Sequence, residues 1–92
     1  MIEFNTETEI KEEIKEETKV SKSLIVYNDD VNSFQHVIIA LIEICGHSNI
    51  QAEQCTLLIH HKGKCAVKEG SEKDLHKMLY GLLDRQISAT IE

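Results

Sequence analysis

The sequence predicts an α+β fold, a single domain with the order β-α-α-β-α-β in which three helices pack on a three-stranded antiparallel sheet. Three observations predict it. A short run rich in β-branched and aromatic residues occurs near position 25, and apolar residues alternate with polar ones near positions 66 and 89. A periodic apolar face lies between positions 75 and 83, and serine or glycine stands at the expected helix ends. With 92 residues, the chain has room for one hydrophobic core.

Residues 23–27 are predicted as the first strand, and residues 28–30 as the turn that ends it, because Asn and Asp favour turns. A helix is expected over residues 34–45, with Asn32 or Ser33 as its N-cap. Its apolar residues surround the helix almost completely, which predicts a central position in the domain.

The second helix is expected to begin after Ser48, which forms a capping box with Gln51, and to end near His60. Gly63 separates it from residues 64–68, where apolar and charged side chains alternate as in a half-buried strand. Neither a long loop nor an internal repeat interrupts this order.

The third helix is expected after Ser71, an N-cap with Asp74 at the third helical position. Its apolar residues recur at helical spacing and predict one buried face: Leu75, Met78, Leu79, Leu82 and Leu83. Residues 87–91 alternate apolar with hydroxyl side chains and are predicted to form the last strand.

The first 22 residues are predicted to be a flexible acidic extension, and residues 23–92 the folded domain. Residues 1–20 contain seven Glu and three Lys with only isolated apolar residues between them. Such a composition favours a disordered or partly helical tail. From composition alone, a tail that only aids solubility is an equally good interpretation.

Composition also excludes several classes of partner. The net charge is −6 and no basic stripe could follow a phosphate backbone, so nucleic acid is not an expected partner. No apolar run reaches the roughly 20 residues that span a bilayer, so no membrane is expected. The acidic start lacks the features of a signal peptide, and we expect a cytoplasmic protein. The three cysteines are expected to be reduced, buried and apolar.

The turn Asn28-Asp29-Asp30 is the most polar point between two apolar elements. Its simplest interpretation is a turn whose side chains cap the backbone. One turn rarely needs two adjacent carboxylates, however. Their repulsion must be relieved by solvent, by amide donors or by a cation, and a free α-amino group is one such cation.

His60 and His61 end the second predicted helix. The simplest interpretation is one surface histidine and one partly buried, satisfied histidine. A neutral imidazole could instead accept a hydrogen bond from a ligand. Metal binding by His47, His60, His61 and the cysteines is a weaker hypothesis, because no CxxC, HxxxH or HExxH spacing occurs. No catalytic motif occurs either, so neither a cofactor nor an enzyme is expected.

Two motifs taken together resemble the ClpS family. The first is Leu24-Ile25-Val26-Tyr27-Asn28-Asp29-Asp30, with Phe34 and Val37 on the following helix. The second is Ile59-His60-His61-Lys62-Gly63-Lys64. The resemblance covers roughly residues 23 to 91. Either motif alone is weak, but their combination at this spacing is specific.

The resemblance implies an adaptor of the bacterial N-end rule, which binds proteins by an exposed N-terminal Leu, Phe, Tyr or Trp (an N-degron). Such adaptors pass their substrates to a Clp AAA+ unfoldase, whose N-terminal domain would be the partner and which would be of the ClpA or ClpC type. The unfoldase feeds the ClpP protease. The implied fold is similar to the C-terminal domain of the ribosomal stalk protein. In this family a flexible N-terminal extension engages the unfoldase during delivery.

By position, the resemblance assigns ten residues to three roles. Those that bind the N-terminal amine are Asn28, Asp29 and His60. Those that hold the peptide backbone and form the rim are Asp30 and Asn32. Those that line the hydrophobic pocket are Phe34, Val37, Thr56, Ile59 and Ser88. Phe34 stands where the family often has Met, which implies a narrower or differently shaped mouth. Thr56 and Ser88 replace larger apolar residues, which implies a roomier or more polar floor.

The chemistry of a chain end agrees with these roles. An α-amine with a reference pKa near 7.7 to 8.0 is mostly an ammonium at neutral pH and needs acceptors and negative charge. Two alternatives stay open. One is an interaction domain of the same fold that modulates a Clp unfoldase without recognising N-degrons, and the other is a small metalloprotein.

Overall fold

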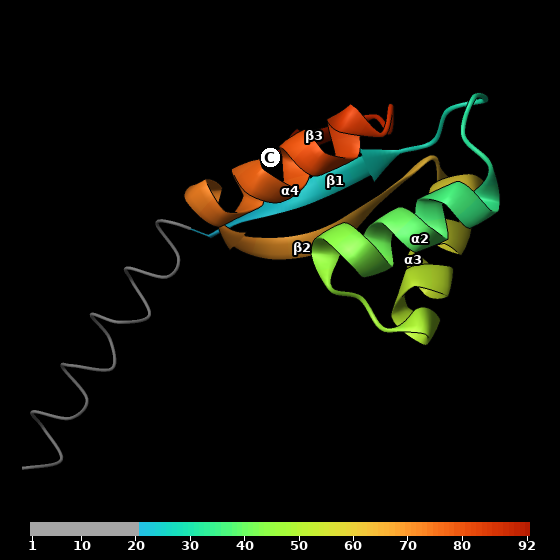
Figure 1. Cartoon of the computed structure of the whole chain (residues 1–92), viewed down its shortest axis with the longest axis horizontal. Helices are drawn as coiled ribbons and strands as arrows, with labels where there is room; N and C mark the ends of the chain where they lie inside the picture. The colour runs from blue at the N-terminus through green and yellow to red at the C-terminus, as the bar shows by residue number, and fades with distance from the viewer. Residues whose placement is uncertain (1–20) are drawn as a thin grey trace, which may run out of the picture.

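The computed structural model describes residues 21–92 and shows three strands and three helices packed into one α+β domain (Figure 1). The elements follow in the order β1 (Ser21–Tyr27), α2 (Phe34–Cys45), α3 (Asn49–Lys62), β2 (Lys64–Ser71), α4 (Glu72–Asp84) and β3 (Ala89–Ile91). The predicted fold class and element order are confirmed. The predicted extension lies outside the described residues except for its last two, which open β1.

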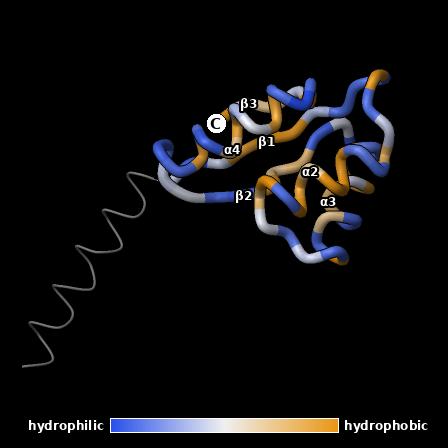
Figure 2. The backbone as a smooth tube through the Cα atoms, viewed as in Figure 1, coloured by the Kyte–Doolittle hydropathy of each residue, from blue (hydrophilic) through white to orange (hydrophobic). Residues whose placement is uncertain are grey.

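β1 is the central strand and runs antiparallel to both neighbours, in the order β2-β1-β3. Leu24 and Val26 of β1 are fully buried, whereas Ile25 between them is only half-buried. Alternation of this kind gives the sheet one face toward the helices and one toward solvent. Figure 2 shows hydrophobic residues along β1 and along the sides of α2 and α4 that contribute to the core.

Serine side chains begin all three helices. Ser33, Ser48 and Ser71 each accept a hydrogen bond from the backbone N–H three residues later, at 3.1, 3.1 and 3.2 Å respectively. Ser33 rather than Asn32 therefore caps α2. Gly46 and Gly63 end α2 and α3 with φ angles of 72° and 92°, a conformation that favours glycine.

Several sequence-based expectations about the elements are corrected. The second strand continues to Ser71, beyond its predicted end at 68, and the last strand begins only at Ala89. Ile39 of α2 is 42% exposed and Leu83 of α4 is 46% exposed. The all-apolar surface of α2 is thus not surrounded by protein, because α2 packs on α3 and α4 and leaves one side to solvent.

The histidines and cysteines also differ from expectation. His60 and His61 are both exposed, and the buried histidine is His47, whose Nε2 lies 2.7 Å from the Val67 carbonyl oxygen. All three cysteines are free, but only Cys45 is fully buried. Within residues 21–92, no helix is long and apolar enough to cross a membrane.

Candidate functional site

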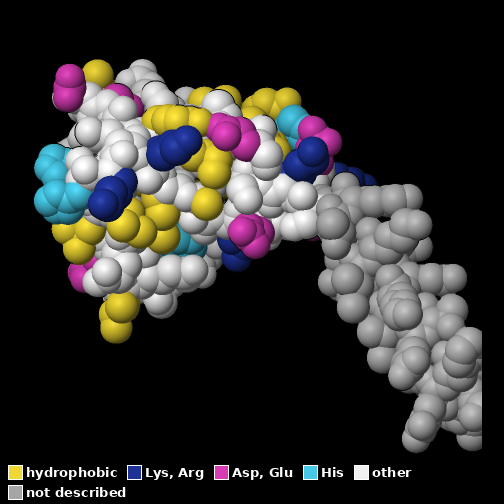
Figure 3. Space-filling view, turned by 180° about the vertical axis from the view of Figure 1, so that it is seen from behind, with side chains coloured by type: hydrophobic (Ala, Val, Ile, Leu, Met, Phe, Trp, Pro, Cys, Tyr) yellow, Lys and Arg dark blue, Asp and Glu magenta, His cyan; other side chains and the backbone are white. Residues whose placement is uncertain are grey.

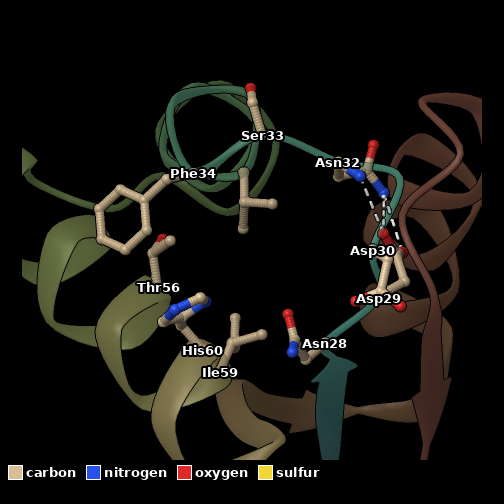
Figure 4. Close-up of a pocket in the computed structure, with 10 residues that line it drawn as sticks. Asn28, Asp29, Asp30, Asn32, Ser33, Phe34, Thr56, Ile59 and His60 are labelled. Carbon is tan, nitrogen blue, oxygen red and sulfur yellow. Dashed lines mark hydrogen bonds between the residues drawn. The ribbon is translucent and has the colours of Figure 1, made fainter.

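A pocket of about 280 Å³ opens where β1 ends, α2 begins and α3 makes its last turns (Figure 4). Ten residues line it, namely Asn28, Asp29, Asp30, Asn32, Ser33, Phe34, Val37, Thr56, Ile59 and His60. The loop 28–33 supplies its polar side, and α2 and α3 supply its apolar side. The pocket is smaller than the sites that enclose drug-sized ligands, and its size suits one side chain with its backbone.

Asp29 organises the loop. Its Oδ1 accepts hydrogen bonds from the backbone N–H groups of Val31 and Asn32, at 3.0 and 2.9 Å. The Asn32 side-chain amide donates to both carboxylate oxygens of Asp29, at 3.0 and 2.9 Å. The same amide donates to the Gln86 carbonyl oxygen at 2.8 Å, which ties the loop to the segment after α4.

These donors also keep Asp29 ionised. The Asn32 N–H acts most strongly, followed by the Asn32 amide and the Val31 N–H, and together they hold the pKa of Asp29 below its ordinary value despite an opposing effect of desolvation. The carboxylate therefore stays negative near neutral pH. Most of its hydrogen-bonding capacity is used within the loop itself, so its contribution to the pocket is mainly charge.

Asn28 and His60 bring acceptors to the pocket from two different elements. The Asn28 N–H donates to the Gly63 carbonyl oxygen at 2.9 Å, which holds the end of β1 against the end of α3. The His60 ring meets the Phe34 ring edge to face, with ring centres 6.4 Å apart and an angle of 81° between their planes. Figure 4 shows these side chains around one opening.

The apolar side of the pocket is built from Phe34, Val37, Thr56 and Ile59. Val37 and Ile59 are only 8% and 3% exposed and form the deep wall, whereas Phe34 is 42% exposed and stands at the mouth. The Thr56 hydroxyl donates to the Ala52 carbonyl oxygen at 2.7 Å within its own helix. With that hydroxyl occupied, Thr56 makes the floor less polar than its residue type implies.

Nine of the ten residues that the sequence assigns to the site line this pocket. Ser88 is exposed and is not among them. Its hydroxyl lies 3.5 Å from Asp29 Oδ2 and so approaches the back of the loop. Ser33 lines the pocket although the sequence pointed to it only as a helix cap. The sequence around Ser33 indicates a helix cap and contains no signal of a place in the pocket.

The described part of the chain, residues 21–92, contains no group of three His, Cys, Asp or Glu side chains placed to hold a metal ion. The rings of His60 and His61 meet edge to face, with centres 5.4 Å apart, but two histidines alone supply too few ligands for a typical zinc site. The pocket instead combines hydrogen-bond acceptors, one carboxylate with a lowered pKa and an apolar wall. Such a combination of groups is chemically suited to a cation attached to an apolar group.

Comparison with known proteins gives one consistent family. The family described as ATP-dependent Clp protease adaptor protein ClpS matches residues 17–88. The ATP-dependent Clp protease adapter protein ClpS of Streptomyces coelicolor is 28% identical over 68 residues, which are 74% of this chain and 71% of that protein. Its counterpart from Streptomyces avermitilis is also 28% identical over 68 residues, covering 74% of this chain and 65% of that protein.

A solved structure shares the fold. Agrobacterium tumefaciens ClpS2 bound to L-phenylalaninamide aligns with a TM-score of 0.72, covering 79% of this chain and 95% of that chain. The sequence identity is 16%, so this likeness concerns the backbone arrangement rather than individual side chains.

Proposed function

The chain belongs to the ClpS family of Clp protease adaptors, and we propose that its pocket binds proteins by an exposed, bulky hydrophobic N-terminal residue. Members of this family are adaptors and not enzymes. The proposal includes delivery of the bound protein to the N-terminal domain of a Clp AAA+ unfoldase, of the ClpA or ClpC type, for degradation by ClpP. We also propose that the protein binds and delivers its substrates in the cytoplasm.

One observation carries the proposal. The acceptors of Asn28 and His60 and the buried wall of Val37 and Ile59 line the same small pocket. An N-terminal residue is a chemical group that needs both at once, because its ammonium and its side chain leave the same carbon atom. A bulky apolar side chain that enters the wall region gains roughly 1.5 to 3 kcal/mol from burial.

Discrimination against internal peptide segments follows from the same acceptors. An ammonium presents three donors, whereas an internal amide presents one donor and no charge. An internal segment in the pocket would leave acceptors unpaired, at a cost of about 1 to 3 kcal/mol for each buried group. The pocket should therefore favour a free chain end over the same residue inside a chain.

The contacts of Asp29 refine its proposed role. The amine-binding set comprised Asn28, Asp29 and His60, but three donors of the loop already bind the Asp29 carboxylate. We assign the direct contacts with the ammonium to Asn28 and His60. Asp29 holds the loop and supplies negative charge beneath it, and Asp30, which is exposed, forms the rim along which the next peptide bonds run.

The ligand of the Agrobacterium protein supports this assignment of ligand class. L-phenylalaninamide has a free α-amino group and a benzyl side chain on one carbon atom, which is the minimal form of an N-terminal phenylalanine. The two proteins share a fold, with a TM-score of 0.72. The pocket residues named here supply the matching chemistry in this chain.

Fluorescence anisotropy tests the proposal. A peptide that begins with Phe and carries a dye near its C-terminus should bind with micromolar or tighter affinity. The same peptide with an acetylated N-terminus should not bind, because acetylation removes the charge and two of the three donors. Equal affinity for the two peptides contradicts the proposed mechanism.

A second candidate function is an interaction domain that modulates a Clp unfoldase without binding N-degrons. This alternative predicts that the domain binds the unfoldase but binds no peptide, whatever the first residue of that peptide is. Delivery itself is measured by the degradation of a reporter with N-terminal Phe by ClpP and a ClpA- or ClpC-type unfoldase. A matched reporter with N-terminal Ser should stay intact.

A further inference from the structure

A second groove, of about 440 Å³, lies between β2, α4 and the end of α2. Its apolar lining comes from Ile44, Leu75 and Met78, with the backbone of Gly70 beside them. The register of the sheet places Gly70 opposite Lys22, near the start of β1, while the peptide pocket begins beyond the end of that strand. The two sites are therefore at opposite ends of the domain.

The packing of α2 against α4 explains the groove. The two helices touch at Ile44 and Gly81, where a Cβ atom on the glycine would come within 3.2 Å of Ile44 Cγ2. Toward the start of α4 the lining contains Gly70, which has no side chain to fill the space. A Cβ at Gly70 would lie 4.0 Å from Leu75 Cδ2, which is ordinary van der Waals contact, so the glycine leaves room for a ligand. Leu75 is only 1% exposed, and the accessible apolar surface of the groove comes mainly from the half-buried Ile44 and Met78.

The chain enters the described domain beside this groove. Ser21 and Lys22 open β1 and pair with Ser71 and Gly70. Figure 1 shows the start of β1, the end of β2 and the start of α4 gathered at one end of the domain. The twenty residues that precede Ser21 are thus covalently attached next to the opening of the groove.

We propose that the groove binds the chain's own segment 10–14, with Ile10 and Ile14 as its apolar anchors. Ile14 is seven residues from Ser21, and seven residues reach about 23 to 25 Å when fully extended, which is ample for an adjacent groove. A site so close to its tether sees the segment at an effective concentration on the order of millimolar. This inference goes beyond the proposed function and does not depend on it.

Charges at the rim are compatible with that occupant. The rim carries both signs, with Lys68 and Lys77 as well as Glu69 and Asp74. Residues 9–16 also carry both signs, with four Glu and two Lys around the two isoleucines. A strongly one-signed partner would face repulsion from half of this rim, whereas a mixed segment can pair each charge.

The consequence is a competition within one molecule. While Ile10 and Ile14 occupy the groove, the segment is withdrawn from any other protein. A partner that binds the segment must first displace it, and a partner that binds the groove must release it. The groove would thus set how readily the first twenty residues are available.

Methionine NMR tests this in the full chain. The protein has two methionines, Met1 and Met78, so selective labelling of methionine methyl groups gives one signal from the groove. We expect cross-peaks between the Met78 methyl group and the methyl groups of Ile10 and Ile14. The double variant Ile10→Ser/Ile14→Ser should lose them and shift the Met78 signal. The variant Ile2→Ser, changed outside the segment, should keep both.

Two results would overturn the proposal. One is a Met78 signal that has no cross-peak to Ile10 or Ile14 and the same position in the double variant. The other is a set of cross-peaks that appears only between differently labelled molecules in a mixed sample, which would make a second copy the occupant. Both variants change only residues before the domain, so its folding does not complicate either result.

Discussion

The side-chain amide of Asn32 donates to both carboxylate oxygens of Asp29, at 3.0 and 2.9 Å, and to the carbonyl oxygen of Gln86, at 2.8 Å. One side chain thus joins the loop after β1 to the segment after α4. The pocket loop is held by these contacts and by the Asn28–Gly63 backbone hydrogen bond, because residues 28–33 belong to no strand or helix. Its shape depends on a small number of polar contacts.

Substitution Asn32→Ala removes those three hydrogen bonds and should weaken binding of a Phe-initiated peptide about tenfold, or about 1.4 kcal/mol. The free energy of unfolding should change less, by roughly 1 kcal/mol, because the loop is exposed on one side. The matched control is Asn49→Ala, an exposed asparagine at the start of α3. Affinity within twofold of the native protein would show that loop order is unimportant.

His60 and His61 offer a matched pair of substitutions. Both are exposed residues of the same helical turn, but only His60 lines the pocket. Loss of an acceptor for an ammonium costs about 1.5 to 3 kcal/mol, so His60→Ala should weaken peptide binding roughly 10- to 150-fold. His61→Ala should leave affinity within about twofold. Similar losses in both variants would assign the effect to the helix end rather than to the acceptor.

The pH dependence of binding tests the negative charge that Asp29 supplies. The pKa of Asp29 is lowered from its ordinary value of 3.8, so the stability that its charge contributes is present above that value and is lost as pH falls through the lower pKa of the folded state. Asp29 therefore stays charged between pH 8 and 5.5.

We therefore expect anisotropy titrations of the Phe peptide to show no loss of affinity due to Asp29 between pH 8 and 5.5. Affinity should fall only at lower pH, as the carboxylate becomes protonated and its negative charge is lost. An Asp29→Asn variant with native affinity at pH 7 would contradict a role for this charge.

Much of the fold follows from local sequence signals. Ser48 with Gln51 and Ser71 with Asp74 fix two helix starts, and Gly46 and Gly63 fix two ends, because these interactions depend only on neighbouring residues. The exposed side of α2 was not predictable in this way. Whether Ile39 is buried depends on which elements pack against its side of α2. The local sequence does not show how far a neighbouring helix extends along that side.

The candidate site, too, was only partly predictable from local sequence. Asn28 and His60 are 32 positions apart, and their common pocket was expected only from the resemblance to a family. The contact of Ser88 with Asp29 spans 59 positions and leaves no local signal, so the sequence did not predict it. The face shown in Figure 3 has Lys and Arg scattered among acidic and apolar side chains, as composition indicated.

Phe34 should set the preference among first residues. Its ring stands at the pocket mouth, 42% exposed and edge to face with His60, so an aromatic first side chain can pack against it. Aromatic pairs add about 0.5 to 1.5 kcal/mol beyond burial, which is roughly 2- to 12-fold in affinity. Phe34→Leu should lower affinity for a Phe-initiated peptide by that factor and leave a Leu-initiated peptide nearly unchanged. An equal loss of affinity for both peptides would show that Phe34 contributes only apolar contact and no specific aromatic pairing.

Gly63 should be the glycine whose side-chain-free backbone matters most for this site. Its φ of 92° is unfavourable for an L-residue, and its carbonyl oxygen accepts the Asn28 N–H at 2.9 Å. Gly63→Ala should therefore destabilise the domain by about 1 to 2 kcal/mol through backbone strain. The midpoint of thermal unfolding should fall by roughly 4 to 8 °C for each kcal/mol. Gly70→Ala is the control, because Gly70 has no positive φ and a Cβ there would meet only Leu75 Cδ2, at 4.0 Å. If both alanine variants unfold at the native temperature, the left-handed turn at the end of α3 is not what holds the acceptors in register.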